Sequence, residues 1–231
     1  MKPVNERLAA VWPAAGVRAI SGDIELRWVD DELLQDIAEV AVGGIHPPDE
    51  MPFNTPWTRG TPIEITRSVM YWIWTLRGST DTDKFHMPLG VLINGNAAGL
   101  QGLQGEHWAM LREAETSSWL GKDFQGKGYG TRMRILALRA AFDGLGAEHV
   151  TSGAFIDNPA SNRVSEKVGY EHDGITREVR DGRVRTAHRY RITRERYESL
   201  RAMHDEILGA PVQLIGFEQL REELENPATH G

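Results

Sequence analysis

The sequence predicts a mixed α/β (α+β) fold in which a mostly antiparallel central sheet is flanked by helices. Two observations lead to this prediction: three short-linked strand patterns in mid-chain, and a glycine-rich loop that opens a helix and precedes another strand. Short links join antiparallel neighbours, whereas a strand–helix–strand unit can make parallel ones. Since no repeat or low-complexity linker is visible, we expect a single domain over residues 1–231, with a core of about 20–192 and a helical extension over 193–231.

The first elements are expected to be one strand and two helices. Ile24 to Trp28 alternates apolar and charged residues, as a half-buried strand does. From Asp30 the apolar residues follow a helical face until Gly43-Gly44, and a second helix is expected from Pro62 to Arg77. The proline-rich loop between them, His46 to Trp57, either packs its large apolar side chains onto the core or forms the wall of a substrate pocket.

The middle of the chain predicts an antiparallel meander. Strands are expected at Pro88–Asn94, Ala97–Gln104 and Met110–Leu120, and Asn94-Gly95-Asn96 is a strong hairpin signal.

The remaining elements follow the glycine loop. Ile135, Leu138, Phe142 and Leu145 recur at helical spacing, with Gly144 and Gly146 ending that helix. The later elements are expected to be a strand at His149–Ile156, a short helix from Asn158-Pro159 to Gly169, a hairpin of Tyr170–Val179 and Val184–Ile192, and helical sequence over Thr193–Asn226 with a break near Gly209–Pro211.

Composition excludes several classes of protein. The net charge of −7 argues against a general nucleic-acid binder, and the absence of cysteine excludes disulfides and thiolate metal sites. The first residues lack the apolar core of a signal peptide, and the aromatic run Tyr71–Leu76 is too short to cross a bilayer. We therefore expect a cytoplasmic protein with no membrane or nucleic-acid partner, and, because the eight histidines show no ligand spacing, no metal.

The loop Gln125-Gly126-Lys127-Gly128-Tyr129-Gly130 is the strongest chemical signal. Glycine lets the backbone approach a ligand closely, and the unpaired N–H groups and dipole of a helix start favour an anion. The spacing fits neither a Walker loop nor a dinucleotide fingerprint. The loop therefore predicts a pyrophosphate cradle, with Lys122 or Lys127 adding charge, although a plain helix-starting turn stays open as an alternative.

The neighbouring motifs extend this signal. Ser118-Trp119-Leu120-Gly121 precedes the loop, and Asn158-Pro159-Ala160-Ser161-Asn162 and Lys167-Val168-Gly169-Tyr170 follow it. Together they resemble the GNAT superfamily of CoA-dependent N-acetyltransferases, most closely its RimJ/RimL-like branch. The resemblance covers roughly Ile24 to Ile192 and implies a GNAT-like fold with acetyl-CoA or another acyl-CoA as co-substrate.

The resemblance also implies roles for individual residues in binding CoA. Trp119, Leu120 and Gly121 would offer main-chain groups to the pantetheine arm where a strand splays from its neighbour. The pyrophosphate would be bound by Gln125, Gly126, Lys127, Gly128, Tyr129, Gly130 and Thr131. Asn158 and Ser161 would reach the pantetheine arm, although Asn158 also suits the role of a helix cap.

Catalysis of amide formation calls for a base and an acid. Glu115 lies four residues before Trp119 on the same strand face, where the family often places a catalytic glutamate; a solvated or cross-strand glutamate is the simpler alternative, and Glu113 is the runner-up. The family commonly has a tyrosine seven residues after the helix-opening asparagine, but this position is Ser165. Ser165 and Ser161 are therefore the hydroxyl candidates.

These features predict an N-acyltransferase that transfers an acyl group from acyl-CoA to a primary amine of a small molecule or a peptide N-terminus. Acetyl is the acyl group that we expect. The missing tyrosine at Ser165 leaves open a non-catalytic acyl-CoA sensor or scaffold. The extension from Thr193 to Asn226 leaves open a homodimer.

Overall fold

A computed structural model describes residues 5–80 and 84–226 of the chain. These residues form one sheet whose strands are β1 (Arg18–Ser21), β2 (Ile24–Trp28), β3 (Lys84–Ile93), β4 (Asn96–Glu106), β5 (Glu113–Leu120), β6 (His149–Phe155), β7 (Glu171–Arg180), β8 (Arg183–Thr193) and β9 (Gln213–Ile215). The spatial order is β7-β8-β6-β5-β4-β3-β2-β1-β9. Only the β5–β6 contact is parallel among these pairs, so the predicted mixed, mostly antiparallel fold class is confirmed.

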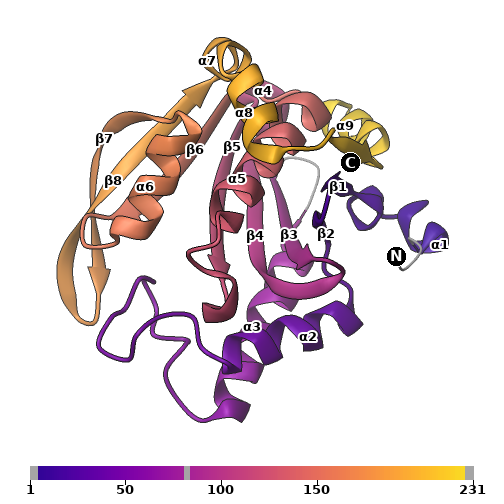
Figure 1. Ribbon diagram of the computed structural model, residues 1–231. Coiled ribbons are helices and arrows are strands. Elements are labelled where there is room, and N and C mark those ends of the chain that lie inside the picture. The colour runs from indigo at the N-terminus through magenta and orange to yellow at the C-terminus, as the bar shows by residue number, and fades with distance from the viewer. Residues whose placement is uncertain (1–4, 81–83, 227–231) are drawn as a thin grey trace.

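Helices cover both faces of this sheet (Figure 1). They are α1 (Glu6–Ala9), η1 (Pro13–Gly16), α2 (Asp31–Val42), α3 (Pro62–Gly78), α4 (Trp108–Leu111), η2 (Lys122–Phe124), α5 (Tyr129–Arg139) continuing as η3 (Ala140–Leu145), α6 (Pro159–Val168), α7 (Arg194–Ser199), α8 (Arg201–Leu208) and α9 (Phe217–Glu225).

Two apolar cores lie on opposite faces of the sheet. The larger one packs α5, η3, α8 and α9 against strands that contribute residues such as Leu103, Ala114 and Leu120. The smaller one packs α2 and α3 against Leu100 and the half-buried Trp119. Because successive strand residues point to opposite faces, β5 presents Ala114 and Leu120 to α5 and presents Trp119 to the other layer.

Two sequence expectations differ from the structure near the ends of strands. Arg18–Ser21 forms a further strand, β1, which pairs with β2 around the turn at Gly22. The strand expected from Met110 starts instead at Glu113, because Trp108–Leu111 forms a helical turn flanked by two residues with positive φ, His107 (+50°) and Arg112 (+49°). Trp108 is fully buried, so this turn closes the apolar core rather than extending the sheet.

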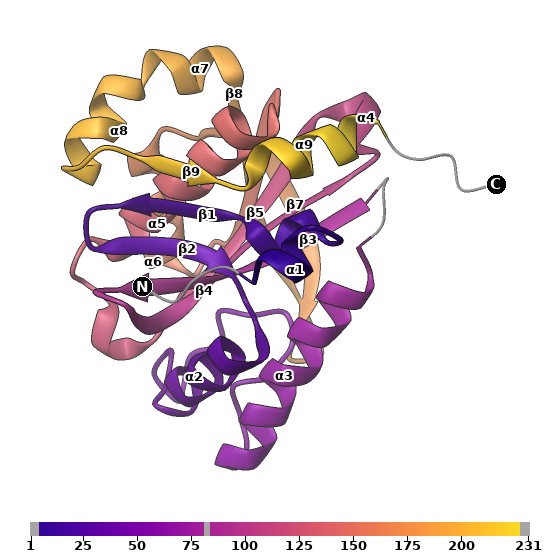
Figure 2. The same ribbon diagram turned by 90° about the vertical axis from the view of Figure 1, so that its right-hand side faces the viewer.

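The segment expected to be a helical extension also contributes a strand to the sheet. β9 pairs antiparallel with β1 and completes that edge, as Figure 2 shows. The break near Gly209–Pro211 is present, since Gly209 ends α8 with a φ of +70°. Phe217, Leu220 and Leu224 of α9 are buried in the larger core. The apolar face of the extension is therefore used within the chain.

His204 fastens the extension to the core. It is fully buried on α8, and its Nε2–H donates to the carbonyl oxygen of Val168 at 2.8 Å. Burial holds the pKa of His204 below its ordinary value, and the nearby guanidinium groups of Arg139 and Arg201 lower it further. The folded chain therefore binds the proton more weakly than the unfolded chain does.

This shift predicts a pH-dependent loss of stability. The contribution of His204 is fully present above the unfolded pKa of about 6.5 and is lost as pH falls below it, by up to ~1.4 kcal/mol per pH unit. His204→Gln should remove that part of the pH dependence, which urea unfolding of both proteins at pH 7 and pH 5 measures. Equal pH dependence in the two proteins would contradict the assignment.

Candidate active site

The parallel strands β5 and β6 separate part-way along their length. Their pairing runs from Glu113–His149 to Thr116–Ser152 and stops there. Beyond that point β5 stays paired with β4 as far as Leu120, and β6 stays paired with β8 as far as Phe155. Among the described residues, no strand therefore pairs with the main chain of Ser117–Leu120 on the β6 side. This is the opening that the sequence predicted beside Trp119.

The glycine loop lies directly after this stretch of β5. Gly126 and Gly128 have φ of +71° and +84°, a region that costs other residues energy, and a Cβ at either would meet no atom within 4 Å. The N-cap of α5 is Gly128, and no side chain in the described part of the chain caps this helix. The N–H groups of Thr131 and Arg132 both donate to the carbonyl oxygen of Gly128 at 3.2 Å, so those of Tyr129 and Gly130 are left for an external anion such as the pyrophosphate of CoA.

The other loop residues differ in what they can offer. Lys127 is exposed, whereas Tyr129 and Gly130 are half-buried and Thr131 is buried. The side-chain amide of Gln125 donates to the carbonyl oxygens of Ile45 (2.6 Å) and Leu120 (2.7 Å), and its main-chain N–H donates to the carbonyl oxygen of Lys122 (3.2 Å). Gln125 therefore ties the loop to its surroundings, and its N–H groups are already in use.

Two of the main-chain groups predicted for the pantetheine arm already have partners inside the protein. The N–H of Gly121 donates to the carbonyl oxygen of Ala98 at 2.9 Å, and the carbonyl of Leu120 accepts from Gln125. Only the other main-chain groups of Trp119, Leu120 and Gly121 therefore remain for the predicted contact with the pantetheine arm.

The residues at the start of α6 serve the helix itself. Asn158 Oδ1 accepts the N–H of Ser161 at 3.1 Å, which is the capping role left open above. Ser161 is half-buried, and Ser165 is fully buried. Within the described residues the Ser165 hydroxyl has no hydrogen-bond partner.

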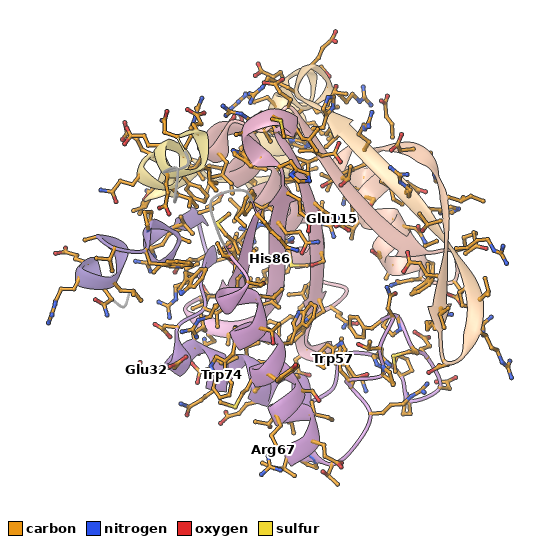
Figure 3. The ribbon with its side chains drawn as sticks, turned by 180° about the vertical axis from the view of Figure 1, so that it is seen from behind. Glu32, Trp57, Arg67, Trp74, His86 and Glu115 are labelled. Carbon is orange, nitrogen blue, oxygen red and sulfur yellow. The ribbon has the colours of Figure 1, made fainter. Side chains whose placement is uncertain are left out.

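Glu115 lies on the sheet face that carries α2 and α3, as Figure 3 shows. It is opposite Gln104 on β4 and Thr151 on β6, and it is exposed. Gln104 Nε2 donates to Glu115 Oε2 at 2.8 Å, which fixes the carboxylate while leaving its other oxygen available. Glu113, two residues earlier on the same face, lies 3.9 Å from Arg191.

An aromatic chain connects the α2–α3 loop to β5. The ring of Trp57 lies 5.7 Å from that of Trp119, and Phe53 lies 5.0 Å from Trp57. The same loop reaches the β7–β8 hairpin, where Asn54 donates to Glu178 at 2.6 Å and Arg59 pairs with Asp181 at 3.1 Å (Figure 1). The rings of this loop pack on the smaller core, as the first of the two expectations has it, and the role of a pocket wall stays a prediction.

Sequence reasoning missed two polar side chains near this opening, Gln104 and Arg134. Arg134 lies in α5 and is buried, and it contacts both β5 and β6. Its signal was a charged residue inside the otherwise apolar run Met133–Leu138.

The sheet opens between two parallel strands, and the helix beside the opening has a glycine at its N-cap. This arrangement is that of a CoA-dependent acyltransferase fold. The family model for the acetyltransferase (GNAT) domain matches residues 23–171, and the chain belongs to this family. The prediction of a GNAT-type protein is thereby confirmed.

Similar proteins agree with this assignment. "Putative ribosomal N-acetyltransferase YdaF" of Bacillus subtilis (strain 168) is 30% identical over 89 residues, which are 38% of this chain and 48% of the relative. The chain thus matches about half the length of this curated relative. A GCN5-related N-acetyltransferase from Brucella melitensis has a TM-score of 0.66 at 18% identity, covering 89% of this chain and 94% of its own. Mycobacterium smegmatis RimJ in complex with CoA-disulfide has a TM-score of 0.62 at 18% identity, covering 81% and 92%.

Within residues 5–80 and 84–226, no group of three or more acidic or histidine side chains could hold a metal ion. None of the helices in that part of the chain is long and apolar enough to cross a membrane.

The positive φ of Gly128 predicts a selective effect of an added methyl group. Gly128→Ala should raise the dissociation constant for CoA by about 5- to 30-fold, because holding alanine in this conformation costs about 1–2 kcal/mol. Gly130→Ala is the matched control, since Gly130 has no positive φ and its added Cβ would meet Val164 at an ordinary 3.6 Å. Calorimetric titration with CoA measures both, and equal losses in the two variants would contradict the assignment.

Proposed function

We propose that the chain is an N-acyltransferase that passes an acetyl group from acetyl-CoA directly to a primary amine. The observation that carries the proposal is the opening between β5 and β6, with the anion cradle of Gly126–Gly130 after it and Glu115 on β5 itself. Family membership supports this activity.

A peptide N-terminus is the acceptor we favour, with a small-molecule amine as the alternative. The YdaF match carries the name of a ribosomal N-acetyltransferase, which supports a protein acceptor. The half-buried rings of Phe53 and Trp57 would give the acceptor an apolar or aromatic surface. We place the protein in the cytoplasm on the same grounds.

The acceptor amine must lose a proton before or during attack, and Glu115 is the group we assign to that step. An α-amine with a pKa of about 8 is roughly one-tenth unprotonated at pH 7, whereas a lysine amine with a pKa of about 10.4 is only about 0.04% unprotonated. The Gln104 amide holds the carboxylate of Glu115 in place from β4. A base therefore matters most for a lysine-like acceptor.

An amine-panel assay tests the proposed function. The full chain is incubated with acetyl-CoA and with peptides, lysine derivatives and small amines, while release of CoA is followed and binding of CoA is measured by calorimetry. Turnover with at least one amine is expected. Absence of both turnover and CoA binding would overturn the proposal, and binding without turnover would favour the sensor or scaffold.

Glu115→Gln provides the catalytic prediction. It should lower kcat by about 10²- to 10⁴-fold with little change in the KM for acetyl-CoA, because it removes the base and leaves the CoA-binding loop untouched. The loss should be larger with a lysine-like amine than with an α-amine. Glu113→Gln, on the same strand face, is the control. Equal rates for wild type and Glu115→Gln would assign the base elsewhere.

A further inference from the structure

Arg134 lies buried at the point where β5 and β6 separate. It belongs to α5 and is 3% exposed. Its guanidinium donates to Ser152 Oγ on β6 at 2.8 Å and to Ser118 Oγ on β5 at 3.0 Å. Ser152 is the last β6 residue paired with β5, and Ser118 lies two residues beyond Thr116, the last paired residue of β5. The side chain therefore spans the opening from the α5 side.

Arg134 is buried without a carboxylate beside it. In the described part of the chain the other buried arginines all form ion pairs: Arg18 with Glu25, Arg139 with Asp143 and Asp205, and Arg180 with Asp157. Arg139 is a direct comparison, because it lies on the same helix and is equally buried at 3% exposure. Among these residues Arg134 has no ion pair, and its Nε has no acceptor.

The neighbours of Arg134 supply hydroxyls and a ring but no negative charge. The Tyr170 ring lies 6.0 Å from the guanidinium, and its hydroxyl shares a 3.0 Å hydrogen bond with Thr116 Oγ1. Burial raises the pKa of Tyr170, so this phenol stays neutral over the physiological range. An uncompensated buried cation is costly, by several kcal/mol in folded proteins. A negative charge that exists here only during the reaction would offset that cost when it forms.

We propose that Arg134 stabilises the thiolate that CoA becomes when acyl transfer occurs. The inference rests on the proposed function. The amine nitrogen bonds to the acyl carbon, the carbon–sulfur bond breaks, and its electron pair stays on sulfur. The proton lost by the amine passes to Glu115 and then to solvent, while the guanidinium keeps its protons and acts by charge alone.

The serine at position 165, where the family commonly has a tyrosine, leaves a role for the positive charge of Arg134. Ser165 is fully buried, its hydroxyl has no partner in the described part of the chain, and a serine hydroxyl is a poor acid. A leaving thiolate is stabilised either by a proton or by a nearby positive charge. In this chain Arg134 offers the charge at the opening where the pantetheine arm is expected.

The expected size of the effect follows from general electrostatics. An opposite charge within about 4–6 Å lowers a pKa by about 1–3 units. A thiol with an ordinary pKa of about 8.5 would then ionise near neutral pH when bound.

The test compares CoA with desulfo-CoA, which lacks the sulfur, in wild type, Arg134→Met and Arg134→Lys. Dissociation constants are measured by calorimetry from pH 6 to pH 9. In wild type the preference for CoA over desulfo-CoA should grow by about tenfold or more across this range. Arg134→Met should abolish that growth, and Arg134→Lys, which keeps the charge, should retain part of it.

Two outcomes would overturn the inference while leaving the proposed function standing. One is a preference that does not change with pH in wild type although CoA binds. The other is an Arg134→Met protein that loses CoA and desulfo-CoA affinity equally, because this would mean that Arg134 only holds the strands apart. Binding of neither ligand to wild type would count against the proposed function itself.

Steady-state kinetics give an independent readout. Arg134→Met should lower kcat by about 10- to 100-fold and change the KM for acetyl-CoA by less than about threefold, as expected for an interaction made mainly in the transition state. Partial recovery in Arg134→Lys supports a charge effect. A KM increase with unchanged kcat would overturn it.

Discussion

The parallel pairing of β5 and β6 ends at Thr116 and Ser152, and the rest of the site is arranged around that end. On their other edges, β5 pairs with β4 and β6 pairs with β8. Moving either strand to close the opening would therefore break the hydrogen bonds of that other pairing. From the α5 side, Arg134 bonds to both strands and Tyr170 bonds to Thr116. The opening is thus built into the sheet before any ligand arrives, and main-chain donors along β5 need no rearrangement to meet one.

The alternation of side chains along β5 divides the chemistry between the two faces of the sheet. Thr116 and Ser118 point toward α5, whose start carries the proposed anion cradle and whose buried Arg134 contacts both β5 and β6. Glu115 and Trp119 point the other way, toward the face where Trp57 of the α2–α3 loop packs on Trp119. β5 therefore carries the proposed base Glu115 on one face, while Arg134 of α5 contacts Ser118 on the other face. This separation matters, since Glu115 would otherwise pair with Arg134 and neutralise both groups.

The elements that the sequence predicted well are those whose signals are local. Asp30 caps α2 with its own side chain, and Thr61 and Glu64 form a capping box for α3, so a few adjacent residues define each helix start. The four-residue β1 gave no such signal, and Ser21 at its end bonds to the carbonyl of Ala210, 189 residues away. Arg134 shows the same limit, because helical spacing predicts that its face is buried but not which strands meet it.

Hydrogen bonds connect the glycine loop to the α2–α3 loop, although the two loops are far apart in the sequence. The side-chain amide of Gln125 donates both of its protons, one to the carbonyl of Ile45 at the start of the α2–α3 loop and one to the carbonyl of Leu120 at the end of β5. The N–H of Lys122 adds a bond to the carbonyl of Gly44 at 3.0 Å. Because all these acceptors are neutral carbonyls, these hydrogen bonds between the two loops are insensitive to pH and salt. The α2–α3 loop is consequently fixed against β5 and the glycine loop within the fold itself, so the entropy of ordering these segments is met during folding rather than during ligand binding.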